Sequence, residues 1–400
     1  MSAVSHARRK DDLHMAPPHL HLAVALDGAG WHPAAWRRPD ARPADLFTAR
    51  YWVDLAQEAE RGLLDLITFE DALGPQSSRD DGPDDRTDQV RGRLDANLVA
   101  ARVAPLTERV GLVPSVVVTH TEPFHVSKAI ATLDHISTGR AGWQPRVSAL
   151  PSEAAHFGRR EVQPDELLDE AADHVEVVRR LWDSWEDDAE IRDVATGRFI
   201  DRDKLHHVDF AGKWFSVKGP SITPRPPQGQ PLVAVLATDA DEHRFAAQAA
   251  DLVFTTPHDV EQARLVEARI RDEQVLAGRA HEDVHVFGDL VVHLGADAAS
   301  RKAQLDELDG AEHVPDAPVF TGSAAELADR LQVLATAGLS GFRLRPGAVP
   351  EDLTAITRDL VPELQRRGLF RTSYDTGSLR ARFGLPRPAS RYATTAGGRP

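Results

Sequence analysis

The sequence contains no cysteine, and this absence excludes disulfides, thiolate metal sites and cysteine nucleophiles. It also lacks an apolar run approaching the length of about 18 residues that suggests a membrane-spanning helix. The first 15 residues (MSAVSHARRKDDLHM) contain no apolar signal-peptide core. We therefore expect a cytoplasmic protein with a disordered leader over residues 1–18.

Positive charge is in deficit, because 47 lysines and arginines stand against 62 aspartates and glutamates, giving a net charge of −15. Nucleic acids and anionic membranes attract positive surfaces, so neither is an expected partner. The signatures GxSxG, HExxH and the Walker loop are also missing, and no cluster at metal-ligand spacing predicts a metal site. These absences favour a site whose chemistry comes from an organic cofactor.

The chain is 42% hydrophobic and 27% charged, which is typical of a soluble globular protein. Patterns of strand and helix alternate along it. The expected strands are 19–26, 63–71, 110–119, the end of 133–148, 231–238, 251–257, 284–294 and 341–346. The expected helices are 47–62, 94–108, 123–137, 167–185, 259–277, 324–337 and 350–367.

Eight strands with helical partners predict an α/β fold of the (β/α)₈ barrel type. The alternative, an open doubly wound sheet, would require a glycine-rich phosphate turn after the first strand. Residues 26–32 (LDGAGWH) contain two glycines without that spacing. Two long insertions interrupt the alternation, at 72–93 and 186–230. We assign them to the second and fourth strands and expect both at the C-terminal strand ends, where barrel enzymes carry their chemistry.

Polar and aromatic side chains gather at the predicted strand ends. Strand ends are often polar in any protein, so the joint pattern matters more than any one residue. With Trp31 and Trp143 at two of these ends, the pattern predicts a pocket for a flat ligand. His32 and His125 are the histidines that we select as candidate proton carriers, because imidazole titrates near neutral pH.

Several long motifs resemble one family. The runs GAGWHPAAWRRPD (28–40), AQEAERGLLDLITFEDAL (56–73) and THTEPFHVSKAIATLDHISTGRAGW (119–143) are similar to bacterial luciferase-like flavin monooxygenases. The closest branch contains nitrilotriacetate, dibenzothiophene-sulfone and long-chain alkane monooxygenases. The resemblance resumes at 198–233, 250–255 and 360–392, and so covers roughly residues 19 to 392.

The resemblance implies a barrel over residues 19–370 that binds reduced FMN at its C-terminal mouth. A separate NAD(P)H-dependent flavin reductase would supply the flavin, and oxygen would add to it as a peroxide adduct that oxygenates a small organic substrate. The catalytic residues would be His32, His125 and Arg146. The cofactor-binding residues would be Asp71, Thr119, Gln144, Arg146, Ser148, Thr238 and Asp239. A tail over 371–400 would pack on the barrel or on a neighbouring subunit of a homo-oligomer.

The chain departs from the family pattern at three places. Residues 144–147 read QPRV, where the family has an asparagine, two aliphatic residues and a threonine; Ser148 alone keeps its identity. Arg146 either reaches the flavin ring or pairs with an acid at a neighbouring strand end. Residues 235–241 (VLATDAD) replace a serine-containing loop for the flavin phosphate, and aspartates disfavour phosphate.

Asp239 also reads as a helix N-cap, with Glu242 completing a capping box. The third departure is a shortened segment between Leu308 and Val319, so the substrate cannot be taken from a relative. These departures leave two alternatives to the FMN-dependent monooxygenase. One is a deazaflavin-dependent hydride-transfer enzyme, and the other is a non-catalytic relative, either flavin-binding or flavin-free.

Overall fold

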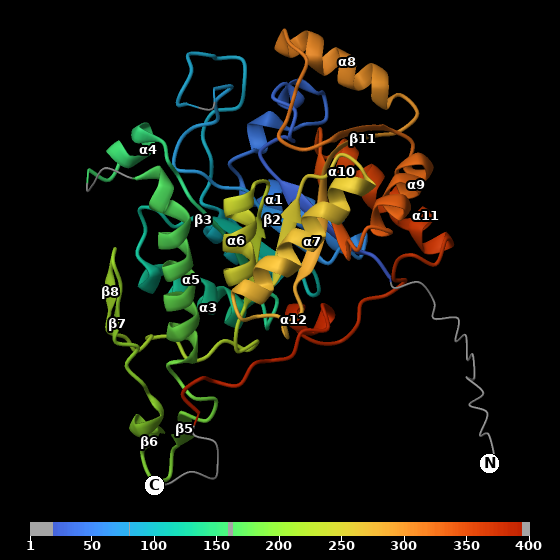
Figure 1. The fold of residues 1–400 in the computed structure, drawn as a ribbon. Coiled ribbons are helices and arrows are strands. Elements are labelled where there is room, and N and C mark those ends of the chain that lie inside the picture. The colour runs from blue at the N-terminus through green and yellow to red at the C-terminus, as the bar shows by residue number, and fades with distance from the viewer. Residues whose placement is uncertain (1–18, 80, 159–162, 394–400) are drawn as a thin grey trace, which may run out of the picture.

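The computed structural model describes residues 19–79, 81–158 and 163–393, so the expected leader lies outside the described residues. Eight parallel strands form a closed barrel, because β1 pairs with β13 and β10 pairs with β11 (Figure 1). The strands are β1 (His21–Leu26), β2 (Leu66–Phe69), β3 (Gly111–Val117), β4 (Gly142–Arg146), β9 (Leu232–Leu236), β10 (Leu252–Thr255), β11 (His285–Leu294) and β13 (Gly341–Pro346). A further strand, β12 (Val319–Gly322), extends the sheet beside the end of β11. The predicted (β/α)₈ barrel is confirmed.

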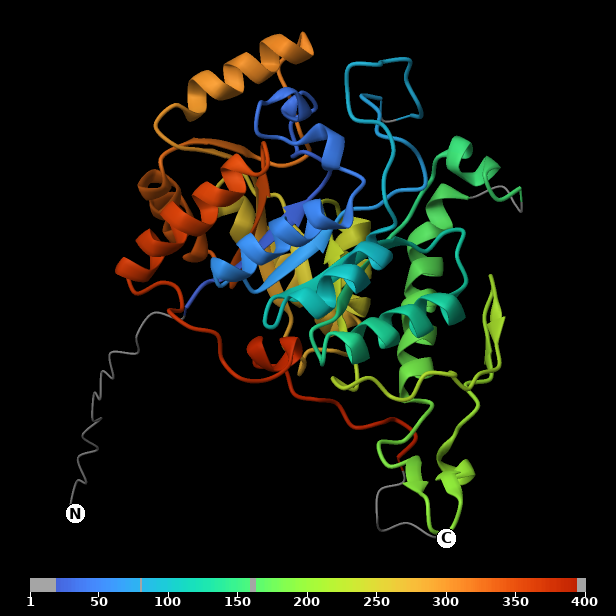
Figure 2. The same ribbon diagram turned by 180° about the vertical axis from the view of Figure 1, so that it is seen from behind.

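Helices surround the barrel, and Figure 2 shows α1 to α3 on the side opposite to α7. They are α1 (Ala49–Arg61), α2 (Ala96–Val103), α3 (Pro123–Ile136), α5 (Leu167–Asp183), α6 (Ala240–Ala249), α7 (Val260–Leu276), α9 (Ala324–Ala335), α10 (Glu351–Ala355) and α11 (Val361–Arg366). Apolar strands covered by helices on their outer face are typical of parallel sheets. Among the described residues, no helix is both long and apolar enough to cross a membrane.

The helix predicted over 350–367 is not regular throughout. Its two α-helical parts are joined by a π-helical turn at Ile356–Leu360. Pro362, within the first turn of α11, has no N–H to donate, and a proline ring crowds the preceding turn of a regular α-helix. A wider π turn just before the proline relieves that conflict.

The C-terminal mouth of the barrel is covered by long connections. The described residues between β2 and α2, which exclude residue 80, form no helix or strand, and they rise above the barrel in Figure 1, as does α8 (Ala298–Asp309). The short helix α4 (Pro151–Ala155) follows β4 on the same side. The predicted long loop at 72–93 is therefore confirmed, and it forms part of the mouth.

The second insertion lies at the opposite end of the barrel, so its predicted place at the C-terminal strand ends is wrong. Residues 186–230 follow helix α5, which returns the chain to the N-terminal ends of the strands. The insertion forms two small hairpins, β5 (Glu190–Asp193) with β6 (Arg198–Ile200), and β7 (Phe210–Ala211) with β8 (Ser216–Val217). Figure 1 shows β5 and β6 far from the mouth loops.

The described part of the tail, residues 371–393, packs on the barrel of the same chain. After α11 the chain runs beneath the barrel (Figure 1) and forms the short helix α12 (Leu379–Arg382). Leu379, Phe383 and Leu385 are buried in a cluster with side chains inside the barrel, including Phe254 and Phe287. The tail therefore closes the N-terminal end of the barrel, while the homo-oligomer stays a prediction.

Candidate functional site

A cavity of ≈ 730 Å³ opens at the C-terminal mouth. The residues after β1, the loop after β2 and the segment after α8 form its walls. Its lining includes Trp31, His32, Trp36, Arg93, Arg146 and His313. Its volume falls in the range of about 300–1,000 Å³ that is usual for small-molecule sites. We therefore take this cavity as the candidate active site.

Trp31 owes its position to a glycine. Gly30 has φ of +127°, and a Cβ at this position would lie 2.5 Å from the carbonyl oxygen of Gly347. Only glycine permits both the conformation and the close approach. The next residue, Trp31, donates its backbone N–H to Pro346 O at 2.9 Å and its Nε1–H to Ala25 O at 3.1 Å. These contacts hold the indole at the mouth, as the sequence predicted.

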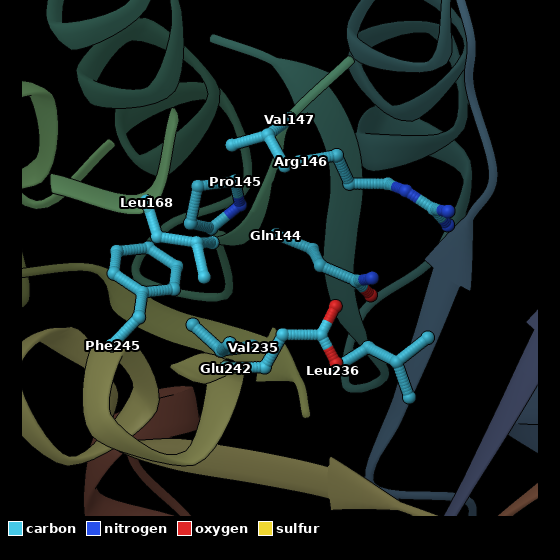
Figure 3. Close-up of a pocket in the computed structure, with 9 residues that line it drawn as sticks. All are labelled: Gln144, Pro145, Arg146, Val147, Leu168, Val235, Leu236, Glu242 and Phe245. Carbon is cyan, nitrogen blue, oxygen red and sulfur yellow. The ribbon is translucent and has the colours of Figure 1, made fainter. Parts of the chain in front are cut away.

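A second, smaller pocket of ≈ 80 Å³ lies between the ends of β4 and β9. Arg146 lines both this pocket and the large cavity, so its side chain lies between the two spaces. Figure 3 shows the lining residues of the small pocket: Gln144, Pro145, Arg146, Val147, Leu168, Val235, Leu236, Glu242 and Phe245. A ligand that extends from the large cavity past Arg146 would place its end here.

Beneath the mouth, two arginines of β13 share one buried carboxylate. Arg343 Nε donates to Asp289 Oδ1 at 2.9 Å, and Arg345 Nε donates to Asp289 Oδ2 at 2.9 Å. All three side chains are buried. Arg345 also donates to Asp316 at 2.6 Å, and its guanidinium lies 4.4 Å from the centre of the Trp31 ring. Paired charges thus lie behind Trp31, which lines the large cavity.

The same network reaches the small pocket through Glu70. Arg343 Nη1 donates to Gln144 Oε1 at 3.0 Å, and Arg146 Nη1 donates to Glu70 Oε2 at 3.1 Å. Burial would raise the pKa of Glu70, but the charges of nearby arginines, Arg343 and Arg146 foremost, hold it below its usual value. Glu70 is therefore a carboxylate, and three arginines balance three carboxylates: Arg146, Arg343 and Arg345 with Glu70, Asp289 and Asp316.

Gln144 and Arg146 point into the barrel, as expected for cofactor-lining residues. The structure gives Arg146 the second of its two predicted roles, an ion pair with a strand-end acid. Its side chain is still 39% exposed, so it also faces the cavity. A guanidinium in this position retains donors for a ligand, because it carries five N–H groups.

Trp143 does not belong to the mouth, and its predicted place there is wrong. Neighbouring residues of a strand point to opposite faces, so the inward Gln144 and Arg146 turn Trp143 outward. The indole is buried against α5, with its ring centre 6.2 Å from that of His174. His174 is almost completely buried, and burial lowers its pKa to about 3.

The protonation of His174 makes stability dependent on pH. In the unfolded chain this histidine would titrate near about 6.5, so below that pH the unfolded state binds a proton that the folded state does not. We expect unfolding of the wild-type protein to become easier as pH falls, and His174→Leu to lose ~2 kcal/mol less than wild type between pH 7 and pH 5. Urea unfolding at the two pH values measures the difference, and any constant packing effect cancels. Equal losses in the two proteins would contradict this assignment.

Three predicted cofactor-binding residues shape loops and line neither of the two cavities. Ser148 donates its backbone N–H to Thr119 Oγ1 at 2.8 Å, which joins the exits of β3 and β4. Asp71 accepts N–H bonds from Ala72 at 2.8 Å and from Ala96 at 2.9 Å, so it holds the start of α2. Burial raises the pKa of Asp71. Their direct contact with a cofactor stays a prediction.

The two candidate catalytic histidines lie in different surroundings. His32 is buried in the cavity wall, accepts from the Ala34 N–H through Nδ1 at 3.1 Å and bonds Asp306 through Nε2 at 3.0 Å. Burial lowers its pKa, against the opposing effect of Asp306. His125 lies exposed near the start of α3 and lines neither of the two cavities. His32 therefore belongs to the wall of the cavity with both ring nitrogens already bonded, and His125 belongs to neither cavity, so a catalytic role of either stays a prediction.

Two further histidines lie beside His32, and the sequence did not mark either of them as a candidate. The ring of His313 lies 5.0 Å from that of His32, and the ring of His293 lies 6.2 Å from it. Burial lowers their pKa values, to about 4 for His313 and about 3 for His293. The group is therefore neutral, and within the described ranges no set of three metal-ligating side chains is placed to hold an ion.

Around the start of α6 two carboxylates accept from the backbone N–H groups of three residues. Asp239 Oδ1 accepts N–H bonds from Asp241 at 3.0 Å and Glu242 at 2.9 Å. Glu242 Oε2 accepts from the Thr238 N–H at 2.7 Å and from its Oγ1–H at 2.8 Å. The predicted N-cap at Asp239 is confirmed. The predicted capping box is wrong, because Glu242 bonds the N–H of Thr238 rather than that of Asp239. A helix N-terminus commonly binds phosphate, but here two carboxylates take these donors, which disfavours an anion at this place. The predicted contact of Thr238 and Asp239 with a cofactor stays a prediction.

Comparisons with known proteins agree on one family. A family model for luciferase-like monooxygenases matches residues 29–361. The chain is 30% identical to the N-acetyl-S-(2-succino)cysteine monooxygenase of Bacillus subtilis, over 94% of this chain and 98% of that protein. It is 28% identical to nitrilotriacetate monooxygenase component A of Aminobacter aminovorans, again over 94% and 98%. In fold it is similar to the crystal structure of long-chain alkane monooxygenase, with a TM-score of 0.83 at 24% identity, over 92% of this chain and 96% of that one.

Proposed function

Because this chain belongs to the luciferase-like monooxygenase family, whose members are flavin-dependent, we propose that it oxygenates a small organic substrate in the cavity of ≈ 730 Å³. The single observation that carries the proposal is the place of this cavity at the C-terminal mouth of the barrel, where barrel enzymes hold their reacting groups. The flavin would supply the redox chemistry and the activation of oxygen.

The chain's own residues would bind the ligands and exclude water. Trp31 offers a flat aromatic surface that Arg345 supports from the other side, and Arg146 offers N–H donors beside the small pocket. The loop after β2 and the segment after α8 enclose the space above them. His32 presents a neutral imidazole whose tautomer is set, because its Nδ1 accepts from a backbone N–H and its Nε2 faces Asp306.

The proposal includes a separate NAD(P)H-dependent reductase that supplies the reduced flavin. A relative over nearly the whole chain is named as component A of its monooxygenase, which supports a divided system. It also includes a cytoplasmic location and a homo-oligomeric assembly.

An anaerobic titration tests the proposal. The protein is titrated with reduced FMN, reduced riboflavin and reduced deazaflavin, and oxygen is then admitted. We expect a reduced flavin to bind at micromolar protein and to reoxidise more slowly than the free flavin, because the site excludes water and bulk solvent. Binding of deazaflavin alone would favour the hydride-transfer alternative. If neither flavin nor deazaflavin binds, the proposal falls.

A further inference from the structure

The small pocket between β4 and β9 is polar at one end and contains a carboxylate. Figure 3 shows the Glu242 carboxylate and the Gln144 amide pointing into the same part of the pocket. Among the described residues that line it, Arg146 is the only cation, and its guanidinium is turned toward Glu70, 3.1 Å away. Within this described lining, Glu242 therefore has no cationic partner.

Only one of the two carboxylate oxygens of Glu242 accepts hydrogen bonds from described residues. Within the parts of the chain that the structure describes, both hydrogen bonds to it end on Oε2, from the N–H and the hydroxyl of Thr238. Oε1 is left to accept a bond from a ligand. A carboxylate oxygen accepts well from a hydroxyl, which has a proton to donate, and repels a phosphate, which is an anion with acceptor oxygens.

We propose that this pocket selects a flavin whose ribityl chain ends in a free hydroxyl, and that Glu242 is the residue that discriminates against the phosphate ester. The proposed occupant is riboflavin rather than FMN, with its side chain passing Arg146 from the large cavity. The inference rests on the proposed function, because that function is what brings a flavin to the mouth. Glu242 acts here as a specificity-determining residue in contact with the cofactor's terminal group.

Two observations support the direction of this preference. First, the amides at the start of α6, which could have cradled a phosphate, donate to Asp239, while Glu242 takes the N–H of Thr238. Second, Glu242 places a negative charge in the pocket, and Asp239 adds another at the N-cap of the same helix, whereas Arg146 is the one cation among the described lining residues. Like charges at such separations in a partly buried site repel strongly enough to shift binding by about tenfold or more.

The test compares two flavins that differ only in the phosphate. Dissociation constants for riboflavin and FMN are measured by quenching of flavin fluorescence, for the wild type, for Glu242→Gln and for Glu261→Gln. Glutamine at 242 removes the charge and keeps an oxygen for the N–H of Thr238. Glu261 provides the matched control, because it lies in the first turn of the neighbouring helix α7 and outside the pocket.

We expect the wild type to bind riboflavin at least about tenfold more tightly than FMN, and Glu242→Gln to remove most of this preference by strengthening FMN binding. Glu261→Gln should keep the wild-type ratio. FMN binding that appears in Glu242→Gln alone would also support the inference. FMN binding to the wild type as tightly as riboflavin, or equal shifts in both variants, would overturn it and leave the proposed function standing. If neither flavin binds to the wild type or to Glu242→Gln, the inference falls, whereas the proposed function falls only if the anaerobic titration shows no binding of a reduced flavin.

Discussion

Asp289→Asn is expected to lower the free energy of unfolding by about 3–5 kcal/mol. Asparagine keeps the size of the side chain and removes the charge. The guanidiniums of Arg343 and Arg345 would then remain buried beside a neutral amide, with one oxygen to accept where two had accepted before. Leaving a buried charge without its counter-charge costs far more than the pair contributes when it is intact.

Urea or guanidinium unfolding measures this loss, and Asp241→Asn provides its control. Asp241 also pairs with an arginine, Arg244, but its side chain is 68% exposed, so its substitution should change stability by no more than about 0.5 kcal/mol. A loss below about 1 kcal/mol in Asp289→Asn would show that water reaches the barrel interior and solvates the arginines.

Phe383→Ala is expected to cost about 3–5 kcal/mol as well, through a cavity at the other end of the barrel. The Phe383 ring lies 4.6 Å from the ring of His21, 5.2 Å from that of His285 and 6.0 Å from that of Phe287. Removing it opens the N-terminal end of the barrel where the tail closes it. The same substitution should also make the tail easier to cleave, because α12 loses its main apolar anchor.

Chemical denaturation and limited proteolysis measure these two effects together. Phe199→Ala is the matched control, because Phe199 lies on β6 and is 63% exposed. Its loss should change stability by less than about 0.5 kcal/mol. If Phe383→Ala behaved like Phe199→Ala, the tail would not be held against the barrel in solution.

The barrel could be predicted from the sequence because its strands carry a local signal. A run such as VGLVPSVVVT (110–119) is apolar and β-branched, and it yields β3 within a few residues of its observed ends. The N-cap at Asp239 was equally local, since cap and first turn are adjacent in the chain. The resemblance to the branch that includes nitrilotriacetate and alkane monooxygenases rested on long motifs, and it is confirmed.

Two predictions were wrong because they concern the position of a residue or segment in the whole fold, which local sequence patterns do not contain. Trp143 was placed on the wrong face because a strand of five residues with a proline shows no clear alternation. The segment 186–230 was predicted at the C-terminal strand ends, but it follows α5, and that helix returns the chain to the N-terminal strand ends.

The site could be predicted only in part, because its charges meet across long separations in sequence. The alternation in GFRLRP places Arg343 and Arg345 on one face of β13, which is a signal that was available. Their shared partner, Asp289, lies 54 residues before Arg343. The predicted barrel makes β11 and β13 neighbours, but no local pattern sets the register that places Asp289 opposite Arg343. The position of His313 could not be predicted either, because it lies in a loop, and hydrophobic periodicity does not predict the path of a loop.

The row of paired charges across the mouth has a consequence for how the sequence can vary. Asp316, Arg345, Asp289, Arg343, Glu70 and Arg146 form a row in which each member neutralises its neighbour. Replacement of one member inside the barrel leaves its partner as a buried, unpaired charge. Replacement of the whole set by apolar residues of similar volume can leave stability unchanged. We therefore expect close homologues to keep these six residues together or to have lost them together, so that selection acts on the set as one inherited unit.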